Sequence, residues 1–143
     1  MPSCSLFGHR DCQEDIRPKL CRVIRELITE HGVDMFYVGD QGRFDAIVRG
    51  VLRQTEREYP HIRYAVVLAY MPGKDRGHGP CTDTMLPEGI ERVHPRYAIS
   101  WRNDWMLRRS DYVVAYTTRS WGGAYRWKEK AIKKGKTVID IGR

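Results

Sequence analysis

YAVVLAY, residues 64–70, is the clearest strand in the sequence. Like MFYV at residues 35–38, it is apolar throughout, which is typical of a parallel sheet that is covered on both faces. Shorter runs at residues 3–7, 112–116 and 137–141 are also expected to form strands. These segments predict a sheet of about five strands.

Helical patterns separate these strands. Apolar residues recur at spacings of three and four between about residues 18 and 31, 44 and 58, 98 and 109, and 123 and 134. Alternating strands and helices predict parallel strands joined by right-handed crossovers. We therefore expect an α/β fold, a Rossmann-like three-layer sandwich with helices on both faces, in a single domain over residues 1–143.

The segment from about residue 71 to residue 96 is rich in proline and glycine. A connection of this length within a compact domain usually covers a functional site or moves. We interpret residues 71–96 as an irregular loop that acts as a lid; the alternative is a disordered surface excursion.

The composition is that of an ordinary globular protein. Hydrophobic residues make up 41% of the 143 residues and charged residues 30%, which excludes disorder, collagen and coiled coil as dominant states. The formal net charge is +7. Excess positive charge attracts anions, so nucleic acids, nucleotides and phosphorylated metabolites are the ligand classes to consider.

The sequence also predicts the compartment. No apolar run approaches the ~18 residues that span a bilayer, and the first residues lack the basic start and apolar core of a signal peptide. We therefore expect a cytoplasmic protein that does not bind membranes. The four cysteines show no CxxC spacing, so we expect reduced thiols and no metal site.

The residues that follow the predicted strands are polar and rich in glycine. In open parallel sheets, ligands bind beyond the carboxyl ends of the strands, near the point where the strand order reverses. The segments at residues 8–11, 39–45, 71–74 and 117–123 occupy such positions. They are therefore the candidates for a functional site.

Two glycine turns in these segments each lead into a helix: Gly39-x-x-Gly42 and Gly122-Gly123. Such a turn lets backbone N–H groups approach a phosphate, and the helix dipole adds about half a positive charge there. Neither turn matches GxGxxG or the P-loop pattern, so we predict no dinucleotide or other cofactor. The glycines indicate an anion site, or simply tight turns between strand and helix.

Three side chains near these turns have two interpretations each. His9 and Arg10 could contact phosphate or polarise a glycosidic leaving group, or they could be ordinary surface residues. Asp45 lies in the first turn of its helix, where a carboxylate stabilises the dipole. It could instead accept a hydrogen bond from a ribose hydroxyl.

Four motifs resemble those of a known superfamily. They are LFGHR at residues 6–10, VGDQGRFD at 38–45, RNDWM at 102–106, and WGGA at 121–124 followed by GKTVI at 135–139. The chain resembles the YpsA-like proteins of the SLOG superfamily, a Rossmann-like group that also includes the lonely-guy cytokinin-activating enzymes and the DprA DNA-processing proteins. The resemblance covers nearly the whole chain except residues 71–96, and it implies a site for a nucleotide or nucleotide-derived molecule.

The enzymatic branch of this superfamily splits N-glycosidic bonds of nucleoside monophosphates with an arginine and a glutamate. By resemblance, Arg102 and Glu129 fall on these catalytic positions. The match departs at Trp121, which stands where the enzymes have proline, and at Tyr125 and Arg126, which replace the Gly-Thr that approaches the phosphate. Asn103 stands where the enzymes have lysine, and asparagine at this position is typical of the binding branch. Glu129 can also be interpreted as a solvent-exposed helix residue that forms ordinary ion pairs.

Three functions remain open at this point. The first is a sensor, carrier or sequestering protein that binds a nucleotide or nucleotide derivative. The second is a phosphoribohydrolase. The third is a DNA-binding module of the DprA kind, which the net positive charge and the basic helices favour. The resemblance also implies a homodimer or larger assembly. The residues predicted to contact the ligand are Gly8, His9, Arg10, Gly39, Asp40, Gln41, Gly42, Asp45, Arg102, Asn103, Gly122 and Gly123.

Overall fold

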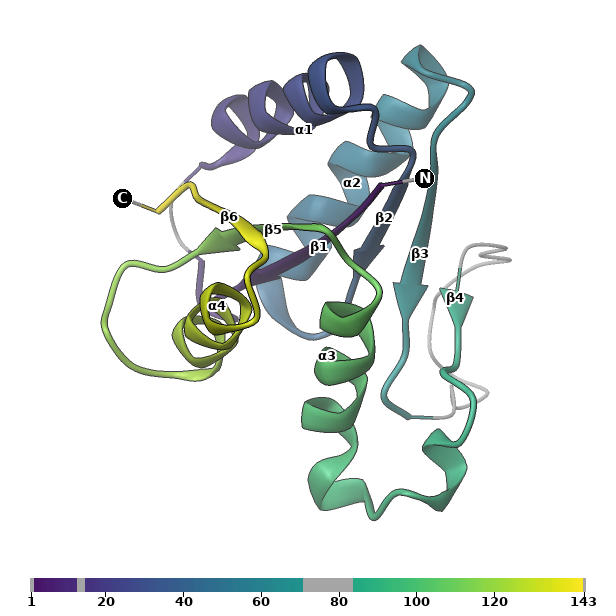
Figure 1. Cartoon of the computed structure of the whole chain (residues 1–143), viewed down its shortest axis with the longest axis vertical. Coiled ribbons are helices and arrows are strands. Elements are labelled where there is room, and N and C mark those ends of the chain that lie inside the picture. Colours follow the sequence, from purple (N-terminus) through teal and green to yellow (C-terminus); the bar gives the residue numbers. More distant parts are fainter. Residues whose placement is uncertain (1, 13–14, 71–83, 143) are drawn as a thin grey trace.

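The computed structural model describes residues 2–12, 15–70 and 84–142, and its strands form one six-stranded sheet (Figure 1). The strands are β1 (Ser3–Gly8), β2 (Met35–Val38), β3 (Arg63–Val67), β4 (Thr84–Met85), β5 (Tyr112–Tyr116) and β6 (Thr137–Asp140). The helices are α1 (Arg17–His31), α2 (Gly42–Glu58), α3 (Ala98–Arg108) and α4 (Gly123–Lys133), with two 3₁₀ turns, η1 (Ile90–Arg92) and η2 (Pro95–Tyr97).

The strand order is β4-β3-β2-β1-β5-β6, and every neighbouring pair is parallel. The chain runs outward from β1 through β2 and β3, then returns to the other side of β1 with β5 and β6. Ser5 accordingly pairs with Tyr37 of β2 on one side and with Val113 of β5 on the other. The strand order thus reverses at β1, and the predicted Rossmann-like α/β sandwich is confirmed.

The sheet has one strand more than predicted. Thr84 and Met85 of β4 pair with Val66 and Val67 at the end of β3, within the segment that the sequence indicated as irregular. Two residues show no hydrophobic periodicity, so only pairing with a neighbouring strand can reveal such an element. Residues 84–97 therefore contain β4, η1 and η2, whereas residues 71–83 of the lid predicted over residues 71–96 lie outside the described residues.

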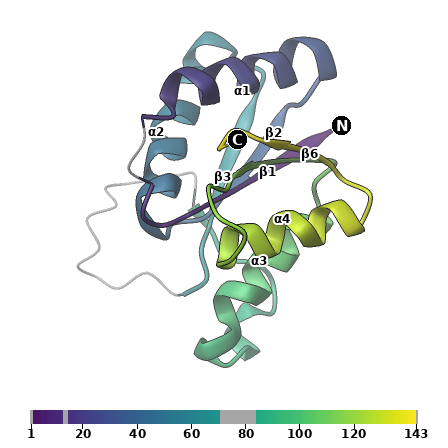
Figure 2. The ribbon, with the colours of Figure 1, turned by 90° about the vertical axis from the view of Figure 1, so that its left-hand side faces the viewer.

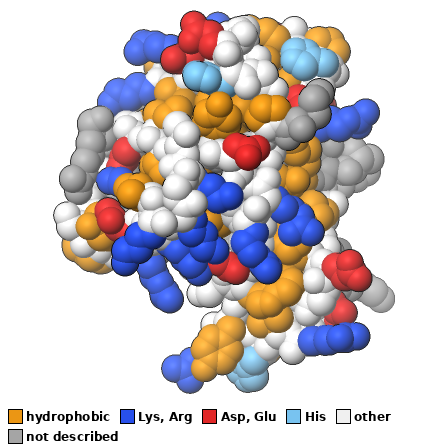
Figure 3. All heavy atoms as spheres, viewed as in Figure 1, with side chains coloured by type: hydrophobic (Ala, Val, Ile, Leu, Met, Phe, Trp, Pro, Cys, Tyr) orange, Lys and Arg blue, Asp and Glu red, His pale blue; other side chains and the backbone are white. Residues whose placement is uncertain are grey.

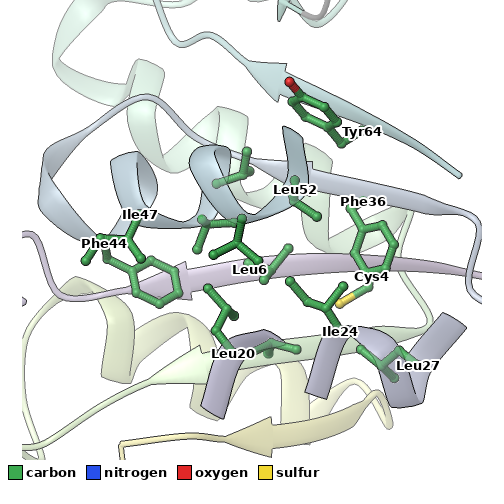
Figure 4. Packing of buried hydrophobic residues seen from close by; sticks show 14 of the residues in the cluster. Cys4, Leu6, Leu20, Ile24, Leu27, Phe36, Phe44, Ile47, Leu52 and Tyr64 are labelled. Carbon is green, nitrogen blue, oxygen red and sulfur yellow. The ribbon is translucent and has the colours of Figure 1, made fainter. Parts of the chain in front are cut away.

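Helices α1 and α2 cover one face of the sheet. Their apolar side chains, including Leu20 and Ile24 of α1 and Leu52 of α2, pack on alternate residues of the strands such as Leu6 and Phe36 (Figure 4). All five side chains are buried, with at most 1% of their surface exposed. This layer is the larger part of the core and holds the ends of β1 and β2 in place.

Helices α3 and α4 cover the opposite face, as a second view of the ribbon shows (Figure 2). Trp105 of α3 and Trp127 of α4 pack there with Phe7 and Val113 of the sheet. Both tryptophans are buried and belong to the core on this face of the sheet. Within the described residues, we find no helix with the length and apolarity to cross a membrane.

Candidate functional site

A cavity of about 300 Å³ lies beyond the carboxyl end of β1. One wall is formed by the segment after β2 and the start of α2. Another is formed by Arg119 after β5 and the start of α4, and residues of α3 form the remainder. This is the place where the strand order reverses, which is the usual ligand position in such sheets. The lining residues are Leu6, Phe7, Gly8, His9, Arg10, Gly39, Gln41, Asp45, Ile99, Ser100, Arg102, Asn103, Met106, Arg119, Gly123, Ala124, Arg126 and Trp127.

Most residues that the sequence singled out border this one cavity. Three others lie directly behind the lining: Asp40 pairs with Arg102, Gly42 packs against Arg10, and Gly122 lies beside Arg119. The structure thus brings together residues from both halves of the chain. The exception is Glu129, which is not among the lining residues.

The guanidinium of Arg102 is buried and held by the protein. Its Nη1 donates to the carbonyl of Val67 at 2.9 Å and lies 3.5 Å from Oδ1 of Asp40, while Nε donates to Oδ1 of Asn103 at 2.9 Å. The side chains of Arg102 and Asp40 are 3% and 2% exposed. An arginine has five N–H donors, so Nη2 is the end that could face a ligand. Arg102 therefore joins α3 to the ends of β2 and β3 as well as bordering the cavity.

Gly39 is glycine because Arg102 and Asp45 occupy the space where its side chain would be. A Cβ at Gly39 would lie 2.6 Å from Nη1 of Arg102 and 2.8 Å from Oδ2 of Asp45. Neither side chain can move away easily, because Arg102 donates a hydrogen bond to the carbonyl of Val67 and Asp45 accepts one from the backbone N–H of Gln41. Gly39 therefore makes room for the side chains of Arg102 and Asp45, and it also borders the cavity.

Asp45 lies in the first turn of α2 and borders the cavity. Its Oδ2 accepts a hydrogen bond at 2.9 Å from the backbone N–H of Gln41, the residue that precedes the helix. Burial raises the pKa of Asp45 to about 6, although the bond from Gln41 and the charge of Arg102 oppose the shift. Asp45 is therefore a carboxyl group that can gain or lose a proton near neutral pH.

His9 is a buried, neutral hydrogen-bonding group. Its side chain packs edge-on against Tyr116, and its Nε2 accepts the backbone N–H of Thr118 at 3.2 Å. Burial, followed by the nearby charge of Arg119, lowers the pKa of His9. With Nε2 accepting, the proton of the neutral ring is on Nδ1, which makes His9 a donor.

The first turn of α4 contributes backbone donors. Gly123 and Ala124 line the cavity, and the hydrogen bond of the first turn runs from Arg126 N to Gly122 O at 3.1 Å. The N–H groups of residues 123–125 precede that bond and so have no partner within the helix. Free N–H groups at a helix start favour an anion.

Helical phase decides which side chains of α4 reach the cavity. Gly123, Arg126 and Trp127 are spaced by three and four residues and all line it, whereas Glu129 is turned by about 200° from Trp127. Tyr125, which by resemblance replaces a residue of the Gly-Thr pair of the SLOG enzymes, is not among the lining residues either; its ring lies 5.8 Å from Nζ of Lys128.

Two arginines of the site were not among the predicted contacts, although one of them, Arg119, lies in the candidate segment 117–123. Arg119 follows β5, and Arg126 belongs to α4. A usable signal existed for both, because each lies within a few residues of the Gly122-Gly123 turn at the carboxyl edge of the sheet. With Arg10 and Arg102, they give the cavity four guanidinium groups.

Lysine and arginine side chains also gather on the outer surface over α4 and α3 (Figure 3). Several of them are neutralised within the protein. Lys130 and Lys134 both contact Asp104 of α3, at 2.9 and 3.6 Å, and Lys128 contacts Asp140 at 3.0 Å. This surface is therefore less positive than its lysines alone suggest.

The cavity combines four arginines, the start of a helix and a titratable carboxyl group at the point where the strand order of a parallel sheet reverses. In comparisons with known proteins, no family model matches the chain and no curated protein matches it significantly.

Proposed function

We propose that the protein binds a phosphorylated nucleotide or nucleotide-derived small molecule in this cavity. The observation that carries the proposal is the balance of charge around it. Arg102 is compensated by Asp40, and Arg119 by Asp11 at 3.2 Å. The two remaining arginines of the lining, Arg10 and Arg126, are exposed and have no acidic partner in the described ranges.

These two guanidinium groups offer positive charge to a phosphate monoester, whose charge is about −1.5 to −2 at pH 7, while Asp45 on the lining offsets part of that charge. The start of α4 adds backbone N–H donors on the side of Arg126. Arginine binds phosphate with paired, charge-assisted hydrogen bonds. The phosphate is therefore assigned to the region between Arg10, Arg126 and the first turn of α4.

The rest of the cavity suits the sugar of such a molecule. Its volume of about 300 Å³ is at the lower limit of ordinary ligand sites, so one small molecule fits. Asp45, Asn103, Gln41 and Ser100 offer acceptors and donors for hydroxyl groups, and apolar side chains such as Met106 form the rest of the lining. The resemblance of the sequence motifs to SLOG proteins agrees with this ligand class.

Hydrolysis of the N-glycosidic bond is the second candidate, and Asp45 is the residue that favours it. A carboxyl group whose pKa is about 6 can protonate a departing base, and a well-placed general acid contributes ~10²–10⁴-fold in rate. Glu129, on the other face of α4, does not border the cavity. Release of free base from AMP would therefore be lost in Asp45→Asn and kept in Glu129→Gln.

Calorimetric titration with AMP, ribose 5-phosphate and unphosphorylated adenosine tests the binding proposal. We expect both phosphorylated compounds to bind and adenosine to bind at least tenfold more weakly. Arg10→Gln and Arg126→Gln should each weaken AMP binding about tenfold or more, because a hydrogen bond to a charged group is lost.

The matched control is Lys133→Gln, which removes one exposed positive charge of α4 that does not border the cavity. It should leave the affinity for AMP within twofold. Equal binding of AMP and adenosine, or equal loss in Arg126→Gln and Lys133→Gln, would show that the cavity does not recognise phosphate.

A further inference from the structure

Trp121 is an exposed aromatic residue next to the cavity. It lies in the loop between β5 and α4, and 65% of its surface is exposed. Arg119 and Gly123, two residues away on either side, both line the cavity. The indole lies against Arg119, a lining residue, although Trp121 itself does not form part of the lining.

One face of the indole is held by Arg119. The Cζ atom of Arg119 lies 4.1 Å from the centre of the Trp121 ring, and Nη1 of the same arginine donates to both carboxylate oxygens of Asp11 at 3.3 and 3.2 Å. Asp11 thus fixes the guanidinium on which the indole rests. This arrangement orders an exposed side chain and leaves a large part of it accessible.

Gly122 follows Trp121 with a φ of +95°, a value that favours glycine, and it lies in ordinary contact with the guanidinium of Arg119. Nε of Arg119 is itself buried and has no hydrogen-bond partner in the part of the chain that the structure describes. A buried donor without an acceptor is costly, so a ligand that brings an acceptor would be favoured.

The surroundings of Trp121 fit a small ligand better than a protein partner. Its sequence neighbours are Ser120 and Gly122, and its packing partner is charged. The other large hydrophobic residues that are exposed among the described ranges are Tyr97 on η2 and Ile132 near the end of α4. Protein interfaces use larger continuous apolar patches, whereas a single aromatic ring among polar groups is enough to stack a planar base.

We propose that Trp121, held by Arg119, is the stacking platform for the base of the bound nucleotide. The inference rests on the proposed function and makes it more specific: the ligand carries a planar ring as well as a phosphate. The phosphate would lie at the first turn of α4, and the base would extend over the rim onto the indole. Stacking uses the π-face that every base has, so AMP is a sufficient probe.

The experiment compares AMP with ribose 5-phosphate, which lacks the base, in the full chain and in Trp121→Ala and Trp121→Phe. AMP should bind more tightly than ribose 5-phosphate to the unmodified chain. Trp121→Ala should weaken AMP binding about five- to hundredfold and leave ribose 5-phosphate within twofold. Trp121→Phe should restore most of the affinity for AMP.

Ile132→Ala is the matched control, because it also shortens an exposed apolar side chain, near the far end of α4. It should not change the affinity for either compound. The elution volume of each variant on a sizing column shows whether Trp121 instead joins two copies of the chain.

The outcomes separate the inference from the proposed function. If both compounds bind and Trp121→Ala changes neither affinity, or changes both equally, the stacking role is wrong and phosphate binding stands. A change of oligomeric state in Trp121→Ala with unchanged AMP affinity also overturns it. If neither compound binds to the unmodified chain, the proposed function fails and the stacking role fails with it.

Discussion

The guanidinium of Arg102 lies 3.5 Å from the carboxylate of Asp40, and both side chains are almost completely buried. Arg102 belongs to α3 and Asp40 follows β2, so this pair joins α3 to the carboxyl edge of the sheet. A buried charge is tolerated only when a partner compensates it. The pair is therefore part of the structure of the cavity before any ligand binds.

Asp40→Ala leaves the charge of Arg102 buried with weaker compensation. We expect the free energy of unfolding in urea to fall by about 3 kcal/mol, as is typical when one partner of a buried pair is removed. The control is Glu58→Ala, which removes an exposed partner of Arg25 and should cost at most about 1 kcal/mol. Equal losses of unfolding free energy in the two variants would show that the buried Arg102–Asp40 pair stabilises the fold no more than an exposed ion pair does.

Gly39→Ala should destabilise the protein by about 1–3 kcal/mol, because its methyl group would overlap Arg102 and Asp45. Gly50 provides the contrast. It lies inside α2 with no heavy atom within 4 Å of the Cβ position, so Gly50→Ala should stabilise by about 0.5–1 kcal/mol. Thermal unfolding of both variants measures the difference, and a neutral Gly39→Ala would contradict the close packing described above.

Asp45 makes the stability depend on pH. Because its pKa is raised to about 6, the folded chain binds a proton more tightly than the unfolded chain does, and its stability falls as the pH rises from about 4 to about 6. The variant Asp45→Asn has no carboxyl group at this position, so this fall in stability with rising pH is absent from it. The unfolding free energy of the unmodified chain minus that of Asp45→Asn should therefore decrease by up to about 3 kcal/mol over this interval.

Taking the difference between the two proteins removes the contribution of His9, which has the opposite sign. The lowered pKa of His9 favours its neutral form in the folded chain, so this group costs stability as the pH falls below 6.5. A difference that stays flat between pH 4 and 7 would show that the pKa of Asp45 is not raised.

The titration of His9 reports on its charged neighbours. Arg119 lowers the pKa of His9 and Asp11 raises it, so Arg119→Gln should move the midpoint upward and Asp11→Asn should move it downward. Nitrogen-15 chemical shifts of the imidazole, followed by NMR from pH 4 to 8, measure both changes. Shifts in the same direction would contradict the arrangement of these three side chains.

The layers of the fold could be predicted from the sequence, and part of the site could not. Apolar runs such as residues 64–70 and glycine turns such as Gly122-Gly123 are local signals, so they indicated strands, helix starts and the edge where a cavity forms. The β4 pairing and the Arg102–Asp40 pair depend on residues that are distant in sequence. No local pattern encodes such partners.

Helical phase explains the different outcomes at α4. Glu129 was chosen by its distance along the chain from the glycine turn, whereas the rotation of the helix carries it away from the cavity that Trp127 borders. Trp121 lies outside the helix, so the spacing that indicates a buried tryptophan did not apply to it. Its exposure follows from the loop and from the support of Arg119.

The walls of the cavity come from opposite ends of the polypeptide: residues 6–45 form one and residues 99–127 the other. A ribosome that has made only the first half of this protein has therefore produced no pocket, however well β1, β2 and β3 have already paired. The proposed ligand would bind only after α4 has emerged and docked beside β1. Such a ligand would therefore stabilise only chains in which all strands and helices have assembled, and it would shift the equilibrium toward the fully folded state at the end of synthesis.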